Sequence, residues 1–257
     1  MLELKNITKI YSPGEINETC LFENFDFKAD DGEFISIVGS NGSGKTSLLN
    51  IICGSIPTDG GEILLDGKDI SKLSEHKRYE QIGRVYQNPS MGNCPDLTIL
   101  ENMALSDSKG KKYGLSAAVN KKRVDFYRER LSVLGLGLED KLHVKVGALS
   151  GGQRQAMSLL MATMTPIRFL ILDEHTAALD PKTAENIMIL TDKIVREKKL
   201  TAVMVTHNLR FAVEYGTRLV MMHRGGIVLD RAGDEKKKST VQDLLSIFNE
   251  ISVECGN

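Results

Sequence analysis

The stretch GSNGSGKT, residues 39–46, constrains the fold of this chain more than any other segment. It follows the apolar run EFISIVG and precedes KTSLLNIICGS, which we expect to be a helix. Glycines in such a loop allow consecutive backbone N–H groups to point at one anion, and the start of the helix adds the positive end of its dipole. The order of strand, glycine-rich loop and helix predicts a phosphate-binding P-loop in an α/β fold.

The P-loop also predicts the ligand. Its match to G-x-x-x-x-G-K-[ST] assigns Lys45 to the β- and γ-phosphates of a nucleotide and the Thr46 hydroxyl to Mg²⁺. We therefore expect a nucleoside triphosphate and Mg²⁺ as cofactors. The expected nucleotide contacts from this segment are Gly39, Ser40, Asn41, Gly42, Ser43, Gly44, Lys45, Thr46 and Ser47.

The other apolar segments alternate between strand and helix patterns. Expected strands occupy 2–11, 20–29, 33–39, 60–70, 82–87, 168–173, 201–207 and 218–230, and expected helices occupy 45–55, 153–163, 181–199, 208–216 and 239–257. Buried strands that alternate with helices imply a mainly parallel sheet flanked by helices. We predict a P-loop NTPase core with an N-terminal antiparallel β part (together 1–87 and 166–257) and a helical subdomain insertion at about 88–165.

Residues suited to hydrolysis follow several of these strands. RFLILDEH contains Asp173 and Glu174, VMVTHN contains His207, and RVYQN contains Gln87. We expect Asp173 to hold the Mg²⁺ shell and Glu174 to orient or deprotonate the attacking water. Parallel strands place their carboxyl ends along one edge, so we expect His207 near the γ-phosphate and Gln87 near Mg²⁺ and the water.

Composition argues against several other functions. The chain has 33 basic and 34 acidic residues and a formal net charge of −1, so nothing in its charge favours a nucleic-acid partner. Cys20, Cys53, Cys94 and Cys255 are scattered without metal-ligand spacing, so we expect reduced, mostly buried thiols. No stretch approaches the roughly 20 apolar residues of a membrane span. We expect a soluble protein that reaches a membrane only through a partner.

A second candidate phosphate cradle occurs at ALSGGQRQ, residues 148–155. Ser150, Gly151 and Gly152 offer a hydroxyl and backbone N–H donors at the start of an expected helix. Together with the P-loop, FLILDE, Gln87, ALDP and His207 in this order, LSGGQ makes the chain resemble the ATP-binding subunit of an ABC transporter. The resemblance covers nearly the whole chain.

The resemblance implies a role for each motif. The P-loop corresponds to Walker A, Asp173 ends Walker B, and Glu174 is the catalytic glutamate. Gln87 corresponds to the Q-loop glutamine, His207 to the switch histidine, Tyr11 to the aromatic that stacks on adenine, and Ala178–Asp180 to the D-loop. The signature comprises Ser150, Gly151, Gly152 and Gln153. The implied catalytic residues are Glu174, His207, Gln87 and Lys45, and the implied metal-binding residues are Thr46, Gln87 and Asp173.

The resemblance also implies partners. In that family two subunits pack head to tail, and each signature closes on the ATP held by the other. It therefore implies an ATPase that forms a homodimer on ATP binding and drives solute import through permease subunits at the cytoplasmic face of the membrane. The string DEHTAALDPKT resembles a bacterial importer branch that uses a separate permease and an extracytoplasmic substrate-binding lipoprotein. Some systems of that kind are linked to amino acids.

Four positions depart from the common family pattern. His175 and Ala177 stand where a proline and a serine are usual, and Ala156 and Met161 stand at arginine positions of the helix after the signature. We expect these changes to affect packing and contacts between subunits rather than phosphate chemistry.

Two alternative functions remain at this point. A non-transport ATPase of the same fold, driving cofactor assembly or another soluble process, shares all these motifs. A regulatory subunit that does not hydrolyse ATP is expected to lack Lys45, Glu174 or His207, and all three are present.

Overall fold

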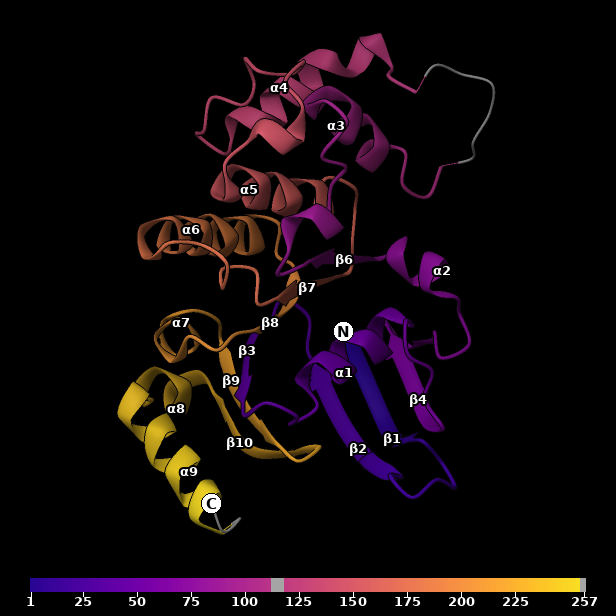
Figure 1. Cartoon of the computed structure of the whole chain (residues 1–257), viewed down its shortest axis with the longest axis vertical. Helices are drawn as coiled ribbons and strands as arrows, with labels where there is room; N and C mark the ends of the chain where they lie inside the picture. The colour runs from indigo at the N-terminus through magenta and orange to yellow at the C-terminus, as the bar shows by residue number, and fades with distance from the viewer. Residues whose placement is uncertain (112–117, 255–257) are drawn as a thin grey trace. The chain divides into compact units, whose positions relative to one another are not determined.

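The computed structural model describes residues 1–111 and 118–254, and these form two compact units (Figure 1). The first unit joins Met1–Tyr79 to Val195–Asn257, and the second is Glu80–Ile194. The chain enters the second unit after Tyr79 and leaves it within helix α6 (Pro181–Glu197). The segment predicted as a helical insertion, about 88–165, lies within the second unit.

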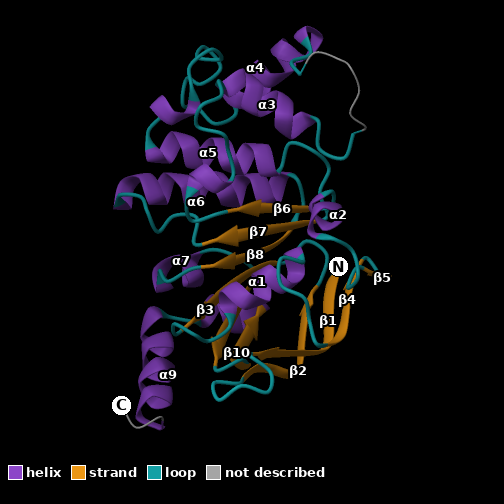
Figure 2. Ribbon diagram, turned by 45° about the vertical axis from the view of Figure 1, so that its right-hand side comes forward, coloured by secondary structure: helices purple, strands orange, loops and turns teal. Residues whose placement is uncertain are grey.

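The N-terminal part of the first unit is a four-stranded antiparallel sheet in the order β2-β1-β4-β5 (Figure 2). Its strands are β1 (Leu2–Tyr11), β2 (Thr19–Ala29), β4 (Gly60–Leu65) and β5 (Lys68–Asp69). Leu2 and Leu4 alternate with more exposed residues along β1, which is the period-two pattern of a sheet with one buried face. The expected antiparallel β part is confirmed.

A second group of strands in this unit carries the P-loop. β3 (Phe34–Gly39) is buried at every residue and pairs in parallel with β8 (Thr201–Val205) and β9 (Arg218–His223). β10 (Gly226–Ala232) pairs with β9 in the antiparallel direction. Because helices cover parallel sheets on both faces, such strands are nearly continuous apolar runs. α1 (Lys45–Cys53) follows β3 through the P-loop.

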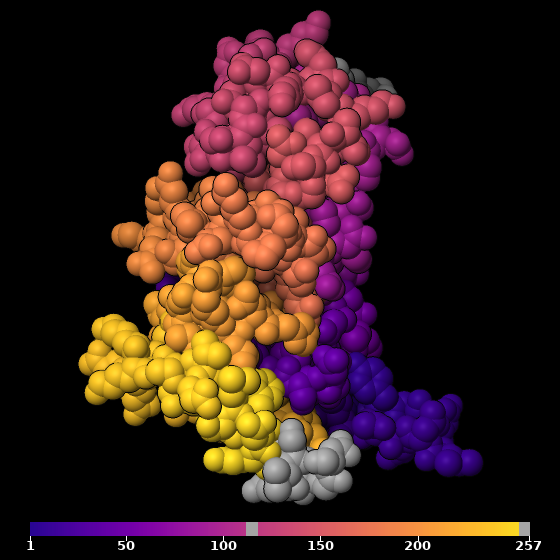
Figure 3. Space-filling view, turned by 60° about the vertical axis from the view of Figure 1, so that its left-hand side comes forward, coloured from indigo at the N-terminus to yellow at the C-terminus, as the bar shows by residue number. Residues whose placement is uncertain are grey.

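Four further helices belong to the first unit: α2 (Glu75–Tyr79), α7 (Leu209–Glu214), α8 (Gly233–Lys238) and α9 (Val241–Glu254). Leu244 of α9 is fully buried against Ala212 and Leu219, and Figure 3 shows the C-terminal segment, in yellow, at the surface of this unit. The amphipathic helix expected near the C-terminus is therefore confirmed for Val241–Glu254, and residues 255–257 lie outside the described part.

The second unit combines a parallel strand pair with helices. β6 (Ile82–Val85) pairs with β7 (Phe169–Asp173), and α3 (Ile99–Asp107), α4 (Val124–Ser132), α5 (Gly151–Ala162) and α6 pack together (Figure 2). Short 3₁₀ turns occupy Pro89–Met91, Lys121–Arg123 and Val146–Ala148. Ala156 and Met161 lie in the apolar core of this unit. These two departures from the family pattern are thus packing positions, as expected.

The segment 218–230, expected as one strand, forms a hairpin instead. Arg224 and Gly225 have φ values of 44° and 77°, and β9 and β10 pair on either side of them. Two successive residues with positive φ are typical of a tight hairpin turn. The Gly225–Gly226 pair was the sequence signal for this turn. Helices α2 and α8 were not expected either, because both are short and strongly charged.

The cysteines differ in part from expectation. Cys53 is buried, whereas Cys20 and Cys94 are exposed, so the prediction of mostly buried thiols is wrong for the described cysteines. These three form no disulfide, as expected for reduced thiols. Cys255 lies outside the described residues.

A buried arginine closes the C-terminal end of α1. Arg78 Nη1 donates to the carbonyl oxygens of Ile51 and Ile52 at 2.7 and 3.0 Å, and its other nitrogens donate to those of Ser71 and Leu73. The last carbonyls of a helix have no intrahelical donor and carry the negative end of its dipole. Arg78 therefore stabilises the helix that begins at the P-loop by binding its opposite end.

We predict that Arg78→Met lowers the free energy of unfolding by about 3 kcal/mol, because several buried carbonyls lose a charged donor. Urea unfolding measures this loss. Arg128→Met is the matched control, because Arg128 is an exposed arginine of α4 and its replacement changes stability by less than about 0.5 kcal/mol. Equal stability of the two variants would contradict this role for Arg78.

Candidate functional site

The predicted site residues divide between the two units. The first unit contains the P-loop, Tyr11 and His207. The second contains Gln87, Asp173, Glu174 and the signature.

The Lys45 side chain lies inside the P-loop. Its Nζ donates to the carbonyl oxygens of Gly39 and Ser40, both at 2.8 Å, and to Ser43 Oγ at 3.3 Å. Lys45 is 5% exposed, whereas Thr46 is exposed at the start of α1. The sequence predicts that Lys45 contacts phosphate, and the structure holds the ammonium within the loop expected to cradle it.

The first residues of α1 present a site suited to an anion. Gly44 precedes the helix in the left-handed region, with φ 102°, and has no side chain that could cap the helix. The first N–H groups of a helix have no intrahelical acceptor and lie at the positive end of its dipole. Such a helix start binds phosphate readily. The loop is fixed from outside, because Gly225 N donates to Ser43 O at 3.1 Å.

Tyr11 lies beside this helix start. Its hydroxyl donates to Ser47 Oγ at 3.2 Å, which ties the end of β1 to the first turn of α1. Lys9 Nζ lies 5.5 Å from the centroid of the Tyr11 ring and forms an ion pair with Asp59 at 3.2 Å. An aromatic ring therefore flanks the P-loop within the first unit, where the resemblance implies adenine stacking.

His207 lies at the same edge of the strands as the P-loop. β3 and β8 are parallel, with Ile37 opposite Val205, and Thr206 N donates to Ile37 O at 3.1 Å. Two residues beyond this pair, Gly39 and His207 lie at the same edge of the two strands, and His207 is exposed there. These two residues therefore share one strand edge, as the sequence predicts.

The same geometry recurs in the second unit. β6 and β7 are parallel, with Val85 opposite Leu172, so Gln87 and Asp173 follow the same edge. Asp173 Oδ2 accepts a hydrogen bond from Arg84 Nη2 at 2.6 Å, and the two side chains form an ion pair. Sequence reasoning missed Arg84. The signal was a charged residue inside the otherwise apolar strand IGRV.

Glu174 has a strained backbone that its neighbour anchors. Its φ is 47°, which is uncommon for a residue other than glycine. The next residue, His175, is 2% exposed, and its Nε2 lies 3.1 Å from Thr191 Oγ1 on α6. Thr191 Oγ1 donates its proton to Ile187 O at 2.7 Å. Thr191 must therefore accept from His175, which fixes the Nε2–H tautomer.

Burial controls the charge of His175. It lowers the pKa of the imidazole from 6.5 to about 4, because the charged form loses its hydration. The ring is therefore neutral at physiological pH. The departure from proline at this position replaces a rigid residue with a buried hydrogen-bonded one next to Glu174.

The signature begins α5 with a capping box. Ser150 Oγ accepts from Gln153 N at 3.2 Å, and Gln153 Oε1 accepts from Ser150 N at 3.1 Å. The first bond of the helix is donated by Arg154 N to Ser150 O, so the N–H groups of Gly151 and Gly152 precede it. These two N–H groups and the Ser150 hydroxyl proton are the donors suited to an anion.

The D-loop packs against the signature. Asp180 directly precedes α6, and its Oδ1 accepts a hydrogen bond from Thr183 N in the first turn at 3.1 Å. Hydrogen bonds from Thr183 lower the pKa of the Asp180 carboxyl. A Cβ atom at Gly152 would lie 2.3 Å from Thr183 Cγ2. The starts of α5 and α6 therefore approach too closely for a larger residue at Gly152.

The residues predicted to bind metal supply oxygen donors of the kind that Mg²⁺ takes. Among the described residues, no group of three or more His, Cys, Asp or Glu side chains is arranged to hold a metal. The predicted donors are one carboxylate (Asp173), one hydroxyl (Thr46) and one amide (Gln87). Mg²⁺ in phosphate-binding sites takes one or two protein carboxylates and completes its shell with phosphate and water.

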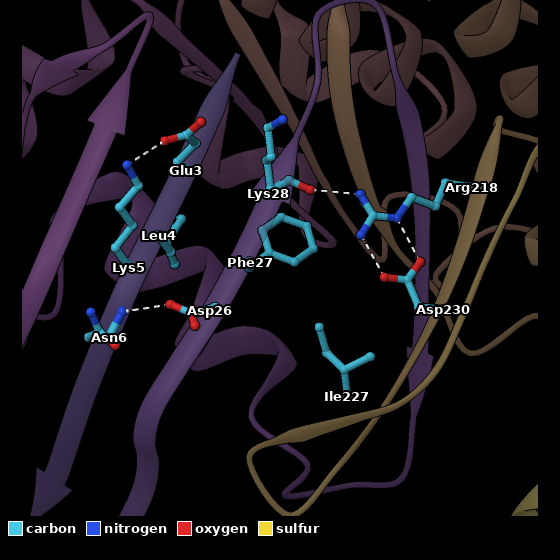
Figure 4. Close-up of a pocket in the computed structure, with 10 residues that line it drawn as sticks. All are labelled: Glu3, Leu4, Lys5, Asn6, Asp26, Phe27, Lys28, Arg218, Ile227 and Asp230. Carbon is cyan, nitrogen blue, oxygen red and sulfur yellow. Dashed lines mark hydrogen bonds and ion pairs between the residues drawn. The ribbon is translucent and has the colours of Figure 1, made fainter.

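A cavity of about 550 Å³ lies elsewhere in the first unit (Figure 4). Its lining residues are Glu3, Leu4, Lys5, Asn6, Asp26, Phe27, Lys28, Arg218, Ile227 and Asp230. Arg218 donates to both oxygens of Asp230 at 2.7 and 2.6 Å and to Lys28 O at 2.7 Å. Arg218 is thus already paired with a carboxylate of the cavity lining.

Comparison with known proteins points to one family. The family described as ABC transporter matches residues 22–177. The chain is 46% identical to the "Tyrosine transport ATP-binding protein" of Clostridioides difficile over 248 residues, covering 96% of this chain and 98% of that protein. A dimeric ATP-binding cassette solved in a post-hydrolysis state with ADP and Pi is 32% identical, with a TM-score of 0.76, covering 90% of this chain and 98% of that one. Every helix in the described part of this chain is too short or too polar to cross a membrane.

We predict that folding stability falls as the pH drops below about 6.5, because His175 has a pKa of about 4 when folded and about 6.5 when unfolded. Between these values the unfolded chain binds a proton that the folded chain does not. This difference contributes up to about 3 kcal/mol, present above pH ~6.5 and lost toward pH ~4.

Urea unfolding from pH 7 to 4.5 measures the effect in wild type and in His175→Gln. The variant removes this titration and leaves the other groups unchanged, so its stability is expected to depend less steeply on pH. Parallel pH profiles for the two proteins would show that His175 does not remain neutral in the folded state.

Proposed function

Because this chain belongs to the ABC transporter ATP-binding family, it is an ATP-binding ATPase of an ABC transporter, and we propose that it drives amino-acid import as a homodimer bound to a separate permease. The observation that carries the proposal is the complete set of motifs in one chain, each at a strand end or helix start suited to its task. Lys45, Glu174 and His207 are all present, which favours a hydrolysing subunit over a regulatory one.

The phosphates bind at the start of α1. The backbone of Gly39–Thr46 and the Lys45 ammonium hold them, and Ser47 and Tyr11 flank the same turn. Tyr11 is proposed to stack on the adenine ring. Thr46, Gln87 and Asp173 are proposed to hold Mg²⁺, which supplies charge neutralisation on the phosphate oxygens.

Hydrolysis is assigned to three polar side chains. Glu174 orients the attacking water and accepts its proton, and its left-handed backbone fixes where the carboxylate points. His207 stabilises charge on the γ-phosphate from its place at the strand edge. Gln87 orients the water and responds to the γ-phosphate.

The signature is proposed to complete the nucleotide site of a second subunit. The chain has one P-loop and one LSGGQ, so two chains related by a two-fold axis make two complete sites. Ser150, Gly151 and Gly152 provide the donors, and Gln153 holds the helix start that presents them. ATP then links the subunits, and hydrolysis releases them. The predicted helical subdomain, about 88–165, carries this loop.

The segment that follows Gln87 is proposed as the permease contact. Asn88 caps the turn Pro89–Met91, Met91 is 67% exposed, and Cys94 is also exposed. An exposed apolar side chain close to the glutamine that senses γ-phosphate suits a docking site that nucleotide controls. This contact would hold the chain at the cytoplasmic face of the membrane.

The substrate proposal rests on the likeness to one curated relative. The Clostridioides difficile relative is named for tyrosine transport, and its 46% identity extends over 96% of this chain. We propose an amino-acid substrate, aromatic amino acids included, delivered by an extracytoplasmic binding protein. Contacts to that solute belong to the permease and the binding protein, because the ATPase subunit contacts nucleotide, its partner ATPase subunit and the permease in this mechanism.

We predict that Glu174→Gln lowers ATP turnover by at least about 100-fold, because the water loses its proton acceptor. ATP-dependent dimers are expected to accumulate, since ATP then remains at the interface. Phosphate release and size-exclusion chromatography with ATP measure the two effects. Unchanged turnover would remove Glu174 from its assigned role.

The double variant Glu174→Gln/Gly151→Asp tests the shared site. A carboxylate at the signature repels the γ-phosphate of the partner's ATP, so dimers are expected to disappear. ATP binding by the single subunit is expected to persist. Loss of that binding would mean that the signature serves the nucleotide of its own chain.

We also predict that tyrosine stimulates ATP hydrolysis in proteoliposomes that contain this subunit, its permease and its binding protein. Alanine and lysine are matched solutes for comparison. Stimulation by neither tyrosine nor another amino acid, with basal ATPase activity intact, would contradict the substrate proposal and leave the ATPase assignment standing.

A further inference from the structure

We propose that Arg84 is a positioning residue that neutralises Asp173 in the absence of magnesium and thereby weakens the binding of Mg²⁺ with ATP. The inference rests on the proposed role of Asp173 as a metal-binding residue. In this inference the Arg84 guanidinium is the counterion of Asp173, and a metal ion that binds Asp173 competes with it.

Strand register places the two side chains on one face. Arg84 of β6 is opposite Ile171 of β7 in the parallel pair. Alternate residues of a strand share a face, so Asp173 lies two residues further along on the same face as Ile171. The Arg84 side chain spans that diagonal and reaches Asp173 Oδ2 at 2.6 Å.

The pair is held in a protected environment. The Arg84 and Asp173 side chains are 6% and 15% exposed. The Arg84 guanidinium lies 4.7 Å from the centroid of the Tyr86 ring, and Tyr86 directly follows β6. Gln155 of α5 donates to Tyr86 O at 3.0 Å. The guanidinium therefore contacts both an aromatic ring and a carboxylate and is largely shielded from water.

A metal ion that approaches Asp173 is repelled by the positive charge of the Arg84 guanidinium. The guanidinium and a bound cation use the same carboxylate, so they lie close together and repel each other. Charges separated from water interact more strongly than exposed ones, and the repulsion on a divalent ion is twice that on a monovalent ion. Removing Arg84 leaves the Asp173 carboxylate without its ion-pair partner, so a bound cation becomes the group that compensates this charge. The repulsion on the cation is lost as well, and a neutral residue at this position therefore favours the metal.

The experiment compares nucleotide affinity with and without metal. The ratio of Kd for a non-hydrolysable ATP analogue in EDTA to its Kd in Mg²⁺ reports how strongly the protein favours the metal-bound nucleotide. We expect Arg84→Met to raise this ratio about tenfold, the same factor by which one neighbouring charge commonly changes an ionisation equilibrium. Arg84→Gln, neutral but able to donate to Asp173, is expected to do the same, and it replaces Arg84→Met if that variant does not fold.

Two matched variants isolate the cause. Arg84→Lys keeps the charge and is expected to keep the ratio near that of wild type, although a purely structural role of the guanidinium fork would make it behave like Arg84→Met. Arg128→Met removes one positive charge at an exposed position of α4, and the ratio should not change. Kd is compared separately in EDTA and in Mg²⁺, and the inference requires that Arg84→Met lowers Kd in Mg²⁺.

The Asp173→Asn background separates the possible failures. Adding Arg84→Met to Asp173→Asn should leave the ratio unchanged, because the carboxylate that couples the charges is absent. An unchanged ratio in Arg84→Met alone, with Asp173→Asn lowering it, overturns the inference and leaves the role of Asp173 intact. If Asp173→Asn does not alter the ratio, the metal assignment of the proposed function fails instead.

Discussion

Parallel pairing of buried strands is the constraint on which the candidate site depends. Side chains that follow parallel strands emerge at one edge, because all the strands end in the same direction. β3 and β8 bring Gly39 and His207 to such an edge in the first unit, and β6 and β7 do the same for Gln87 and Asp173 in the second. The apolar strands thus fix the position of polar residues that do not pack in the core themselves.

Buried cationic and imidazole groups need hydrogen-bond partners in place of water, and the structure supplies these partners in three ways. Lys45 and Arg78 bind backbone carbonyls at the two ends of α1, whereas Arg84 binds a carboxylate and His175 stays neutral beside a hydroxyl. Each solution satisfies the donors that burial removes from water. They differ in what a ligand must displace. Lys45 and Arg84 differ from Arg78 and His175 because their partners have a proposed task in ATP binding.

The sequence was sufficient to place the P-loop between β3 and α1 and Asp173 at the end of β7, because these signals are local. The pairs Arg84–Asp173, Arg78–Ile51 and His175–Thr191 join residues 89, 27 and 16 positions apart. No periodic pattern encodes such contacts. The hairpin at Arg224–Gly225 was missed for another reason, since an apolar run on each side of the turn had the pattern of one long strand.

The capping box refines what the signature offers an anion. Ser150 Oγ and Gln153 Oε1 both accept hydrogen bonds from backbone N–H groups of their own helix start. An oxygen that accepts in this way still has its own proton to donate in a serine, but a glutamine carbonyl has none. The side-chain oxygen of Gln153 therefore contributes rigidity, and in the proposed shared site the phosphate donors are Ser150 and the N–H groups of Gly151 and Gly152. Such donors are fixed before the ligand arrives, which in that proposal reduces the entropy lost when a second subunit closes.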